Sequence, residues 1–462
     1  MSYVDRPLSL SKKNERYFET MNKLVQTIVV ASLLLLTATS AFTQEAGSDW
    51  ETMNAEVGTL FQQRQYDRAV VVAEKALDIA EKTVDENYSE VVMSLNNLAV
   101  VFKAQGKYVD AEPLHKRMLA ILEKELGPSH PNVASTLSNL AGLYQVQGKY
   151  AQAEQLYQRM LEIDQKTLGP DHPDVANSLN NMASLYEAQG KVAQAEAFYK
   201  RSLAILEKAD DPDIPGIAVS LNNLALLYHR QGKYAQAEPL CKRSLAIKEK
   251  SLDPNDPSVA VCLNNLAELY RDQGKSVESE ALYKRALAIY EKALGPDHYI
   301  VGATLGGMAD LYCIKGRYAE AEPLYKRALA LSEKTFGPDH LSIAISLSGL
   351  AELALKQGKF SEAEVLSKRS LSIREKALGP DHSDVSLSLE GLADLYRDQG
   401  NYAQAEPIYK RALAIREKTL GPDHPSVAAS LNGMAELYRK TGRVRDAGAL
   451  QQRAAKILAL AR

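Results

Sequence analysis

The sequence has few of the residues that build cross-links or metal sites, and it has no excess charge of one sign. Its 462 residues include 3 Cys, 1 Trp and 7 Phe, against 23 Tyr. The odd cysteine count and the lack of CxxC spacing give no zinc ligand set, and we expect no cofactor or metal. The 55 Lys and Arg nearly balance 58 Asp and Glu, for a net charge of −3. This balance excludes the basic stripe of a nucleic-acid-binding protein and a polybasic membrane patch.

The three cysteines allow two interpretations. In an oxidising compartment Cys241 and Cys262 could form a bridge between neighbouring helices. The alternative is that both, together with Cys313, are small substitutions in the core or on the surface.

The N-terminus has the pattern of an export signal. Residues 1–20 are polar and slightly basic, an apolar run covers 28–36, and Thr39 and Ala41 are small residues at the −3 and −1 positions. This pattern predicts a leader over 1–41 whose signal peptide spans 21–41, and hence an exported protein, periplasmic or secreted.

Two points about this leader stay open. The proportions of the signal fit a start at Met21 as well as one at Met1. An uncleaved helix over 24–42 could instead anchor the chain in the inner membrane, and this is the only membrane contact that we expect. A third possibility is a cytoplasmic protein whose leader has no export role.

A strict internal repeat is the dominant feature of the chain. One proline recurs every 42 residues, at Pro128, Pro170, Pro212, Pro254, Pro296, Pro338, Pro380 and Pro422. One glycine keeps the same period, at Gly106, Gly148, Gly190, Gly232, Gly274, Gly316, Gly358, Gly400 and Gly442. Arg64 occupies the preceding slot, so we count ten units: a degenerate first one over 42–83 and nine further 42-residue repeats over 84–462.

Each unit reads as a pair of helices. In one unit Val175, Leu179, Met182, Ala183 and Tyr186 recur at helical spacing, which predicts an amphipathic helix. A glycine ends this helix because it can adopt positive φ without steric cost. A second apolar series follows, and a Gly-Pro-Asp-His-Pro connector then stops that helix and begins the next.

These residues resemble the tetratricopeptide repeat family over roughly 48–462. One repeat matches its motif at Leu221, Leu224, Ala225, Tyr228, Gly232 and Ala237, and another at Leu305, Met308, Ala309, Tyr312, Gly316, Ala321, Tyr325 and Ala328. The period, the Leu-Asn-Asn-Leu-Ala core and the connector look like the kinesin light chain variety. The resemblance implies an all-α fold, a right-handed superhelical solenoid of about ten helix–turn–helix repeats. Stacking curls such an array and lines its concave groove with the first helix of each pair.

No part of the sequence has the irregularity that an enzyme site needs. Six histidines lie one to a connector, about 10 Å apart given helix spacing, too far to share a metal ion; they are His130, His172, His298, His340, His382 and His424. Gly302, Gly306 and Gly307 fall within a helix and not in a phosphate loop. We therefore expect no catalytic residues.

A ladder of amides marks the candidate groove. The first helices carry Asn96, Asn97, Asn139, Asn180, Asn181, Asn222, Asn223, Asn264 and Asn265 at recurring places, and glycine replaces the second Asn from Gly307 onward. An amide both donates and accepts, which suits a peptide main chain, and the resemblance implies this role. Five such layers would follow roughly 15 extended residues. The alternative is that these amides bond neighbouring helices and never reach a ligand.

One turn further along the same helices the residues become charged toward the C-terminus. Val100, Gly142, Ser184 and Leu226 give way to Glu268, Asp310, Glu352, Asp394 and Glu436, accompanied by Arg271, Arg397 and Arg439. The residues could be ion pairs of a solvated helix, each contributing a few tenths of a kcal/mol. They could also form a charged half of the groove, which predicts a bound segment that is apolar at one end and basic or mixed at the other.

The function that follows is a non-catalytic protein–protein interaction scaffold that holds a peptide or partner protein in the groove. The alternative is a sensor or regulatory subunit of a signalling or secretion system whose effector is a separate polypeptide.

Overall fold

A computed structural model describes residues 49–82, 88–209 and 214–460, and these form two compact units. The predicted leader over 1–41 and the predicted anchor over 24–42 lie outside the described residues. In the N-terminal unit seven helices follow one another, and α9 (Val192–Lys208) joins it from residue 197 onward. The seven are α2 (Asp49–Gln62), α3 (Tyr66–Glu81), α4 (Tyr88–Ala104), α5 (Tyr108–Leu126), α6 (Pro131–Val146), α7 (Tyr150–Leu168) and α8 (Pro173–Ala188).

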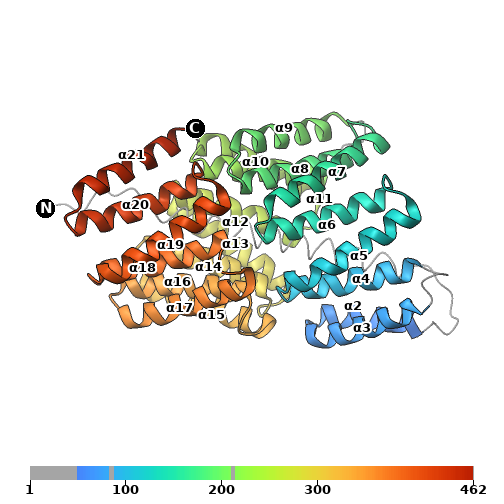
Figure 1. Ribbon diagram of the computed structural model, residues 1–462, viewed down its shortest axis with the longest axis horizontal. Helices are drawn as coiled ribbons and strands as arrows, with labels where there is room; N and C mark the ends of the chain where they lie inside the picture. Colours follow the sequence, from blue (N-terminus) through green and yellow to red (C-terminus); the bar gives the residue numbers. More distant parts are fainter. Residues whose placement is uncertain (1–48, 83–87, 210–213, 461–462) are drawn as a thin grey trace. The chain divides into compact units, whose positions relative to one another are not determined.

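The C-terminal unit contains residues 189–196 and the described chain from 214 onward. Its helices are α10 (Ile214–Arg230), α11 (Tyr234–Ser251), α12 (Pro257–Asp272), α13 (Ser276–Leu294), α14 (Tyr299–Ile314), α15 (Tyr318–Phe336), α16 (Leu341–Lys356), α17 (Phe360–Leu378), α18 (Ser383–Asp398), α19 (Tyr402–Leu420), α20 (Pro425–Lys440) and α21 (Val444–Leu460). Figure 1 shows that the helices follow one another as antiparallel pairs in both units. We call the first helix of each pair helix A and the second helix B.

Local chemistry explains why each pair folds back on itself. Helix A ends at a glycine with positive φ, such as Gly148 at 71°. The next amide, that of Lys149, donates to the carbonyl of Tyr144 at 2.8 Å, which closes the helix end. In the first pair Arg64 takes this position with φ 58°. The pair α2–α3 lies within the range predicted for the degenerate repeat.

The connector after helix B begins the next helix through its histidine. The Nδ1 atom of each connector histidine accepts the backbone N–H two residues further on, at 3.1–3.2 Å; these are His130, His172, His298, His340, His382 and His424. In one connector the Asp256 carboxylate does the same at 2.7 Å. The connector histidines are therefore helix caps, which satisfies a backbone donor that the helix itself leaves unpaired.

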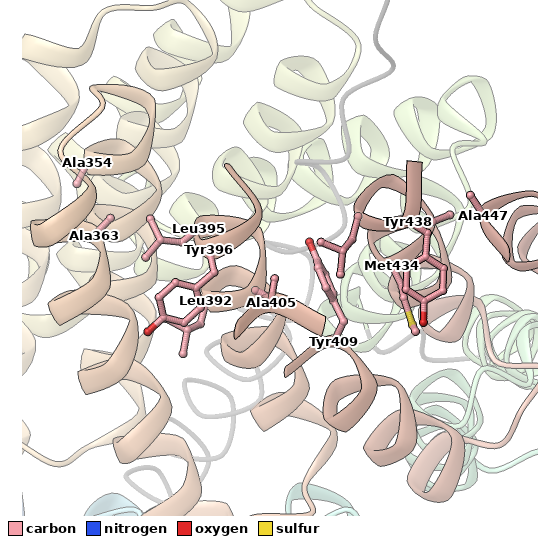
Figure 2. Packing of buried hydrophobic residues seen from close by; sticks show 13 residues of the cluster. Ala354, Ala363, Leu392, Leu395, Tyr396, Ala405, Tyr409, Met434, Tyr438 and Ala447 are labelled. Atoms are coloured by element: carbon pink, nitrogen blue, oxygen red, sulfur yellow. The ribbon is translucent and has the colours of Figure 1, made fainter. Parts of the chain in front are cut away.

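The apolar core passes from layer to layer. In the C-terminal unit one cluster joins Ala354 on α16 to Ala447 on α21 through the buried tyrosines of α18, α19 and α20. Figure 2 shows these side chains, with Tyr396, Tyr409 and Tyr438 interleaved with small alanines. Each pair thus covers the apolar side of its neighbour, as expected for a repeat array. The predicted fold class, an all-α solenoid of paired helices, is confirmed.

None of the described helices combines the length and the apolar character needed to cross a membrane.

Candidate functional site

The helices A of the C-terminal unit form a continuous layer. Helix α12 packs on α11 and α13 and also contacts α10 and α14, the helices A on either side of it. In the N-terminal unit α6 likewise contacts α8, and α2 contacts α4. Within the described residues no two successive helices B pack as closely. Residues that recur every 42 positions on helix A therefore form rows that run across neighbouring repeats.

Three of the predicted amides donate to a polar side chain of the preceding helix A. The Nδ2 atom of Asn97 donates to Asn54 Oδ1 at 2.6 Å, and that of Asn265 donates to Asn222 Oδ1 at 2.7 Å. The Asn181 Nδ2 atom donates to Ser138 Oγ at 3.2 Å. Each bond joins the second amide place of one repeat to the first place of the repeat before it. For these three side chains, and for Asn222 and Asn264, the structure shows the interhelical role that was the alternative in the sequence.

The remaining amides differ in exposure. Asn139 is exposed, Asn96 and Asn223 are half-buried, and Asn180 and Asn264 are buried. Asn264 donates to Thr304 Oγ1 at 2.8 Å, and its Oδ1 atom is sealed from solvent without a hydrogen-bond partner. Direct contact between a ligand and these amides stays a prediction, and Asn139 is the one already open to it.

At three of the four glycines that replace Asn along the ladder, the tyrosine of the preceding helix B fills the place of a side chain. A Cβ atom on Gly349 would lie 2.5 Å from the Tyr325 ring, and one on Gly307 would lie 2.8 Å from Tyr283. A Cβ atom on Gly433 would lie 3.0 Å from Tyr409 in the same way. These glycines leave room for the tyrosine of the preceding helix B. The tyrosine alone does not explain the change, because Tyr157 and Tyr199 precede Asn181 and Asn223 at the same spacing, and a Cβ atom on Gly391 would have nothing within 4 Å.

The charged row begins with a buried cluster in the C-terminal unit. The Arg271 Nε atom donates to Asp272 Oδ1 at 2.9 Å, and its Nη1 atom lies 3.4 Å from Asp310 Oδ2. The His229 Nε2 atom lies 2.9 Å from Asp272 Oδ2. Glu268 is buried beside them, and its Oε1 atom has no hydrogen-bond partner.

Burial controls the protonation of this cluster. It raises the pKa of Glu268 to about 8 and that of Asp310 to about 6, although the charge of Arg271 lowers both. Burial acts in the same direction on Asp272, but the hydrogen bond to His229 and the charge of Arg271 outweigh it and lower the pKa of that carboxyl. Glu268 is thus held largely neutral at pH 7.

Further along the row, Arg397 connects two repeats. Its Nη1 atom lies 2.7 Å from Asp394 Oδ1 and 3.3 Å from Glu436 Oε2. The side chain of Glu436 is 50% exposed, and Glu352 is half-buried. Tyrosine hydroxyls of helices B donate to two of these acids, Tyr325 to Asp310 and Tyr409 to Asp394. The row is therefore more than a set of ion pairs within single helices, and it opens to solvent toward its end.

The remaining candidate residues are the cysteines and the possible metal ligands. All three cysteines are free thiols, so the bridge between Cys241 and Cys262 that the sequence left open does not form. Burial raises the pKa of Cys241 to about 12, which makes this thiol a poor nucleophile. Among the described residues no group of three or more His, Cys, Asp and Glu side chains could hold a metal ion.

Comparison with known proteins adds a family and several similar structures. The family described as tetratricopeptide repeat matches residues 51–124, 90–161, 132–208, 216–292, 263–334, 300–376, 343–418 and 384–459. No curated protein matches the chain.

Among solved structures, the chain is similar to a kinesin light chain protein of Podosopora anserina with nearly identical TPR-like repeats. Identity is 29% over 45% of this chain and 97% of that one, with a TM-score of 0.39. BtubC from P. vanneervenii is 21% identical over 50% of this chain and 91% of its own, with a TM-score of 0.40. A Rap protein complexed with competence and sporulation factor is 15% identical over 90% of this chain and 100% of its own, with a TM-score of 0.51. At that identity the last likeness concerns the fold alone.

Proposed function

The chain belongs to the tetratricopeptide repeat family, and from that premise we propose that it is a non-catalytic scaffold that binds an extended segment of a partner along its helices A. Tetratricopeptide arrays are protein-interaction scaffolds, so a protein or peptide is the class of partner to expect. The partner would contact several repeats at once, because helices A of successive repeats contact one another, as α6 and α8 do in the N-terminal unit and α10 to α20 in the C-terminal unit.

The observation that carries this proposal is the recurrence of polar residues in the middle of otherwise apolar helices. On α8 the apolar Leu179, Met182 and Ala183 are buried, whereas the neighbouring Asn181 and Ser184 are only half-buried. The place of Asn181 holds the exposed Asn139 on α6, and the place of Ser184 holds the exposed Glu436 on α20. Polar side chains at the same phase of successive helices can bond a main chain that crosses them.

The chemistry of the bound segment follows from the charges of each unit. In the C-terminal unit the acids Asp310, Glu352, Asp394 and Glu436 outnumber the arginines of the same row, of which Arg397 is already paired. In the N-terminal unit the matching places hold Val100, Gly142 and Ser184. A basic segment of a partner would complement the C-terminal unit, and an apolar segment would complement the N-terminal unit.

Selection of binders from a displayed library of random peptides, each roughly 15 residues long, tests the proposal. The selected peptide is then titrated against the chain 42–462 and two variants. A peptide that binds the N-terminal unit should lose affinity about tenfold or more with Asn139→Ala combined with Asn181→Ala, and a peptide that binds the C-terminal unit should lose it with Glu436→Lys. The control is Lys166→Ala, which removes an exposed side chain of helix B on α7 and should leave affinity unchanged. Equal affinity in all variants, with folding intact by circular dichroism, would contradict the proposal.

We propose further that the scaffold acts outside the cytoplasm, on the strength of the signal-like pattern over 21–41. Cell fractionation followed by N-terminal sequencing of the recovered protein tests this. Export with cleavage predicts a first residue at Phe42, and a full-length protein in the cytoplasmic fraction would contradict it.

A further inference from the structure

Arg374 on α17 is a buried cation that lacks a carboxylate partner. The side chain is 8% exposed, and no Asp or Glu of the described residues comes within ion-pair distance of it. Its hydrogen bonds all leave from one atom, Nη1, which donates to Ser370 Oγ at 2.7 Å, to Ser348 Oγ at 3.1 Å and to Ser388 Oγ. These three hydroxyls come from α16, α17 and α18.

The equivalent place in the next repeat shows what is missing. Arg416 lies 42 residues further on, and its Nη1 and Nη2 atoms meet the two carboxylate oxygens of Glu390 at 2.7 and 2.8 Å. Its Nε atom donates to Ser386 Oγ at 2.8 Å, so each of its nitrogens has an acceptor. The residue 42 positions before Glu390 is Ser348. The repeat of Arg374 therefore keeps the cation and replaces the internal carboxylate by a hydroxyl.

The serines solvate Arg374 without neutralising it. Ser348 and Ser370 both donate their hydroxyl protons to the Ala344 carbonyl, at 2.9 and 2.6 Å, which leaves their lone pairs for the guanidinium. A buried charge that lacks a counter-charge is costly. Burial accordingly lowers the pKa of Arg374 to about 10, and the charge of Asp384 opposes this only in part.

One edge of the Arg374 guanidinium remains available. The Nε and Nη2 atoms have no acceptor among the described residues. Neither atom is completely sealed from solvent. These two atoms form the side-on fork of the planar group, whose parallel N–H bonds match the two oxygens of a carboxylate. The adjacent Arg416 binds two carboxylate oxygens from within the chain, there through Nη1 and Nη2.

We propose that Arg374, held by Ser348, Ser370 and Ser388, is a binding site for one carboxylate group that the chain itself does not supply. The carboxylate belongs either to an acidic side chain or C-terminus of a bound protein segment, or to a small free carboxylate ion. The second source makes the site independent of the partner binding proposed above.

The first experiment replaces sodium chloride by sodium acetate at constant ionic strength and pH, and follows the thermal unfolding midpoint of the full chain. A ligand that binds only the folded state raises this midpoint with concentration. We expect the rise for the wild type and its loss in Arg374→Gln. The matched control Arg416→Gln, whose site already holds an internal carboxylate, should keep the rise. A wild type that responds equally to acetate and chloride, or an Arg374→Gln variant that responds like the wild type, would overturn the proposal.

A second pair of variants supplies the missing carboxylate from within. Ser348→Glu places an acid where the next repeat has Glu390, and Ser348→Gln is its uncharged counterpart. We expect a higher unfolding midpoint for the Glu variant than for the Gln variant, together with loss of its acetate response. A Gln variant as stable as the Glu variant would contradict an uncompensated charge at Arg374.

The source of the carboxylate is resolved with two capped peptides, acetyl-alanyl-glutamyl-alanine amide and its glutaminyl counterpart. Binding of the glutamyl peptide at least tenfold tighter than acetate, lost in the glutaminyl peptide and in Arg374→Gln, assigns the site to a protein segment. Equal affinities of acetate and the glutamyl peptide assign it to a free carboxylate. Equal binding of both peptides to the wild type and to Arg374→Gln would count against the site.

Discussion

Single glycines in helices A show how the residue that fits in one repeat depends on the side chains of the preceding repeat. Glycine inside a helix usually costs about 1 kcal/mol relative to alanine. A methyl group added at Gly391 would have no atom within 4 Å, because the preceding helix B carries Ser367 in place of tyrosine. A methyl group added at Gly349 would lie 2.5 Å from the Tyr325 ring.

These two positions should therefore respond oppositely to the same substitution. Gly391→Ala should raise the free energy of unfolding by up to about 1 kcal/mol, as helix propensity predicts. Gly349→Ala should lower it, because the Tyr325 ring must move. Thermal or urea unfolding measures both, and a shift of the same sign in the two variants would contradict the packing described.

Stability should also depend on pH through buried histidines, such as His115. His115 on α5 is 1% exposed, and neither ring nitrogen has a hydrogen-bond partner. Burial, and the nearby charge of Lys103, lower the pKa of His115 to about 3. The unfolded chain protonates near pH 6.5 while the folded one does not, so stability present above that pH is lost as pH falls toward 3.

His115→Phe removes this titration and fits the aromatic slot that Tyr157 fills in the next repeat. We expect the variant to exceed the wild type in stability, by a margin that grows between pH 7 and pH 4. Chemical unfolding at several pH values measures it. A margin that stays constant across this range would show that the histidine does not stay neutral on folding.

The surroundings of single residues could be predicted only in part from the sequence. The positions of the ladder amides followed from the period, but their partners did not. Asn265 bonds Asn222 while Asn139 stays exposed, although both occupy the second amide place. The outcome depends on the residue that a neighbouring helix presents, and a single repeat pattern does not contain it.

At the scale of the elements, the connector histidines define where helices A begin. His130 caps α6 by accepting the Asn132 N–H at 3.1 Å, and Asp256 caps α12 with a carboxylate at 2.7 Å. His130→Ala removes the acceptor and should lower the free energy of unfolding by about 1 kcal/mol. His130→Asp should retain most of this free energy of unfolding. Unfolding of both variants tests this, and an alanine variant as stable as the aspartate one would rule out a capping role.

Helix boundaries were the most predictable part of the fold. Glycine and proline interrupt the apolar pattern every 42 residues, and the structure places a helix end at each such glycine, for example α8 ending at Ala188 before Gly190. The buried pairs were not predictable in this way. Arg416 and Glu390 lie 26 residues apart, and the place of Glu390 holds serine in the preceding repeat although the arginine is kept, so only the packing of α18 against α19 brings the pair together.

At the scale of the whole molecule, the 42-residue period runs through the repeats without a break. It therefore does not predict that the described part of the chain forms two compact units. What the repeat does predict is that stability is shared between neighbours. The apolar cluster that connects α16 to α21 has this property, since buried residues of six successive helices belong to it.

The central claim is that a partner binds along helices A. A photo-reactive benzoylphenylalanine in place of Asn139 on α6 or Glu436 on α20 samples exposed positions of these helices, and one in place of Lys166 on α7 or Lys410 on α19 samples exposed positions of helices B. Illumination with the bound partner should yield cross-links from Asn139 and Glu436 and none from the two lysine positions. Cross-links confined to the lysine positions would contradict the account.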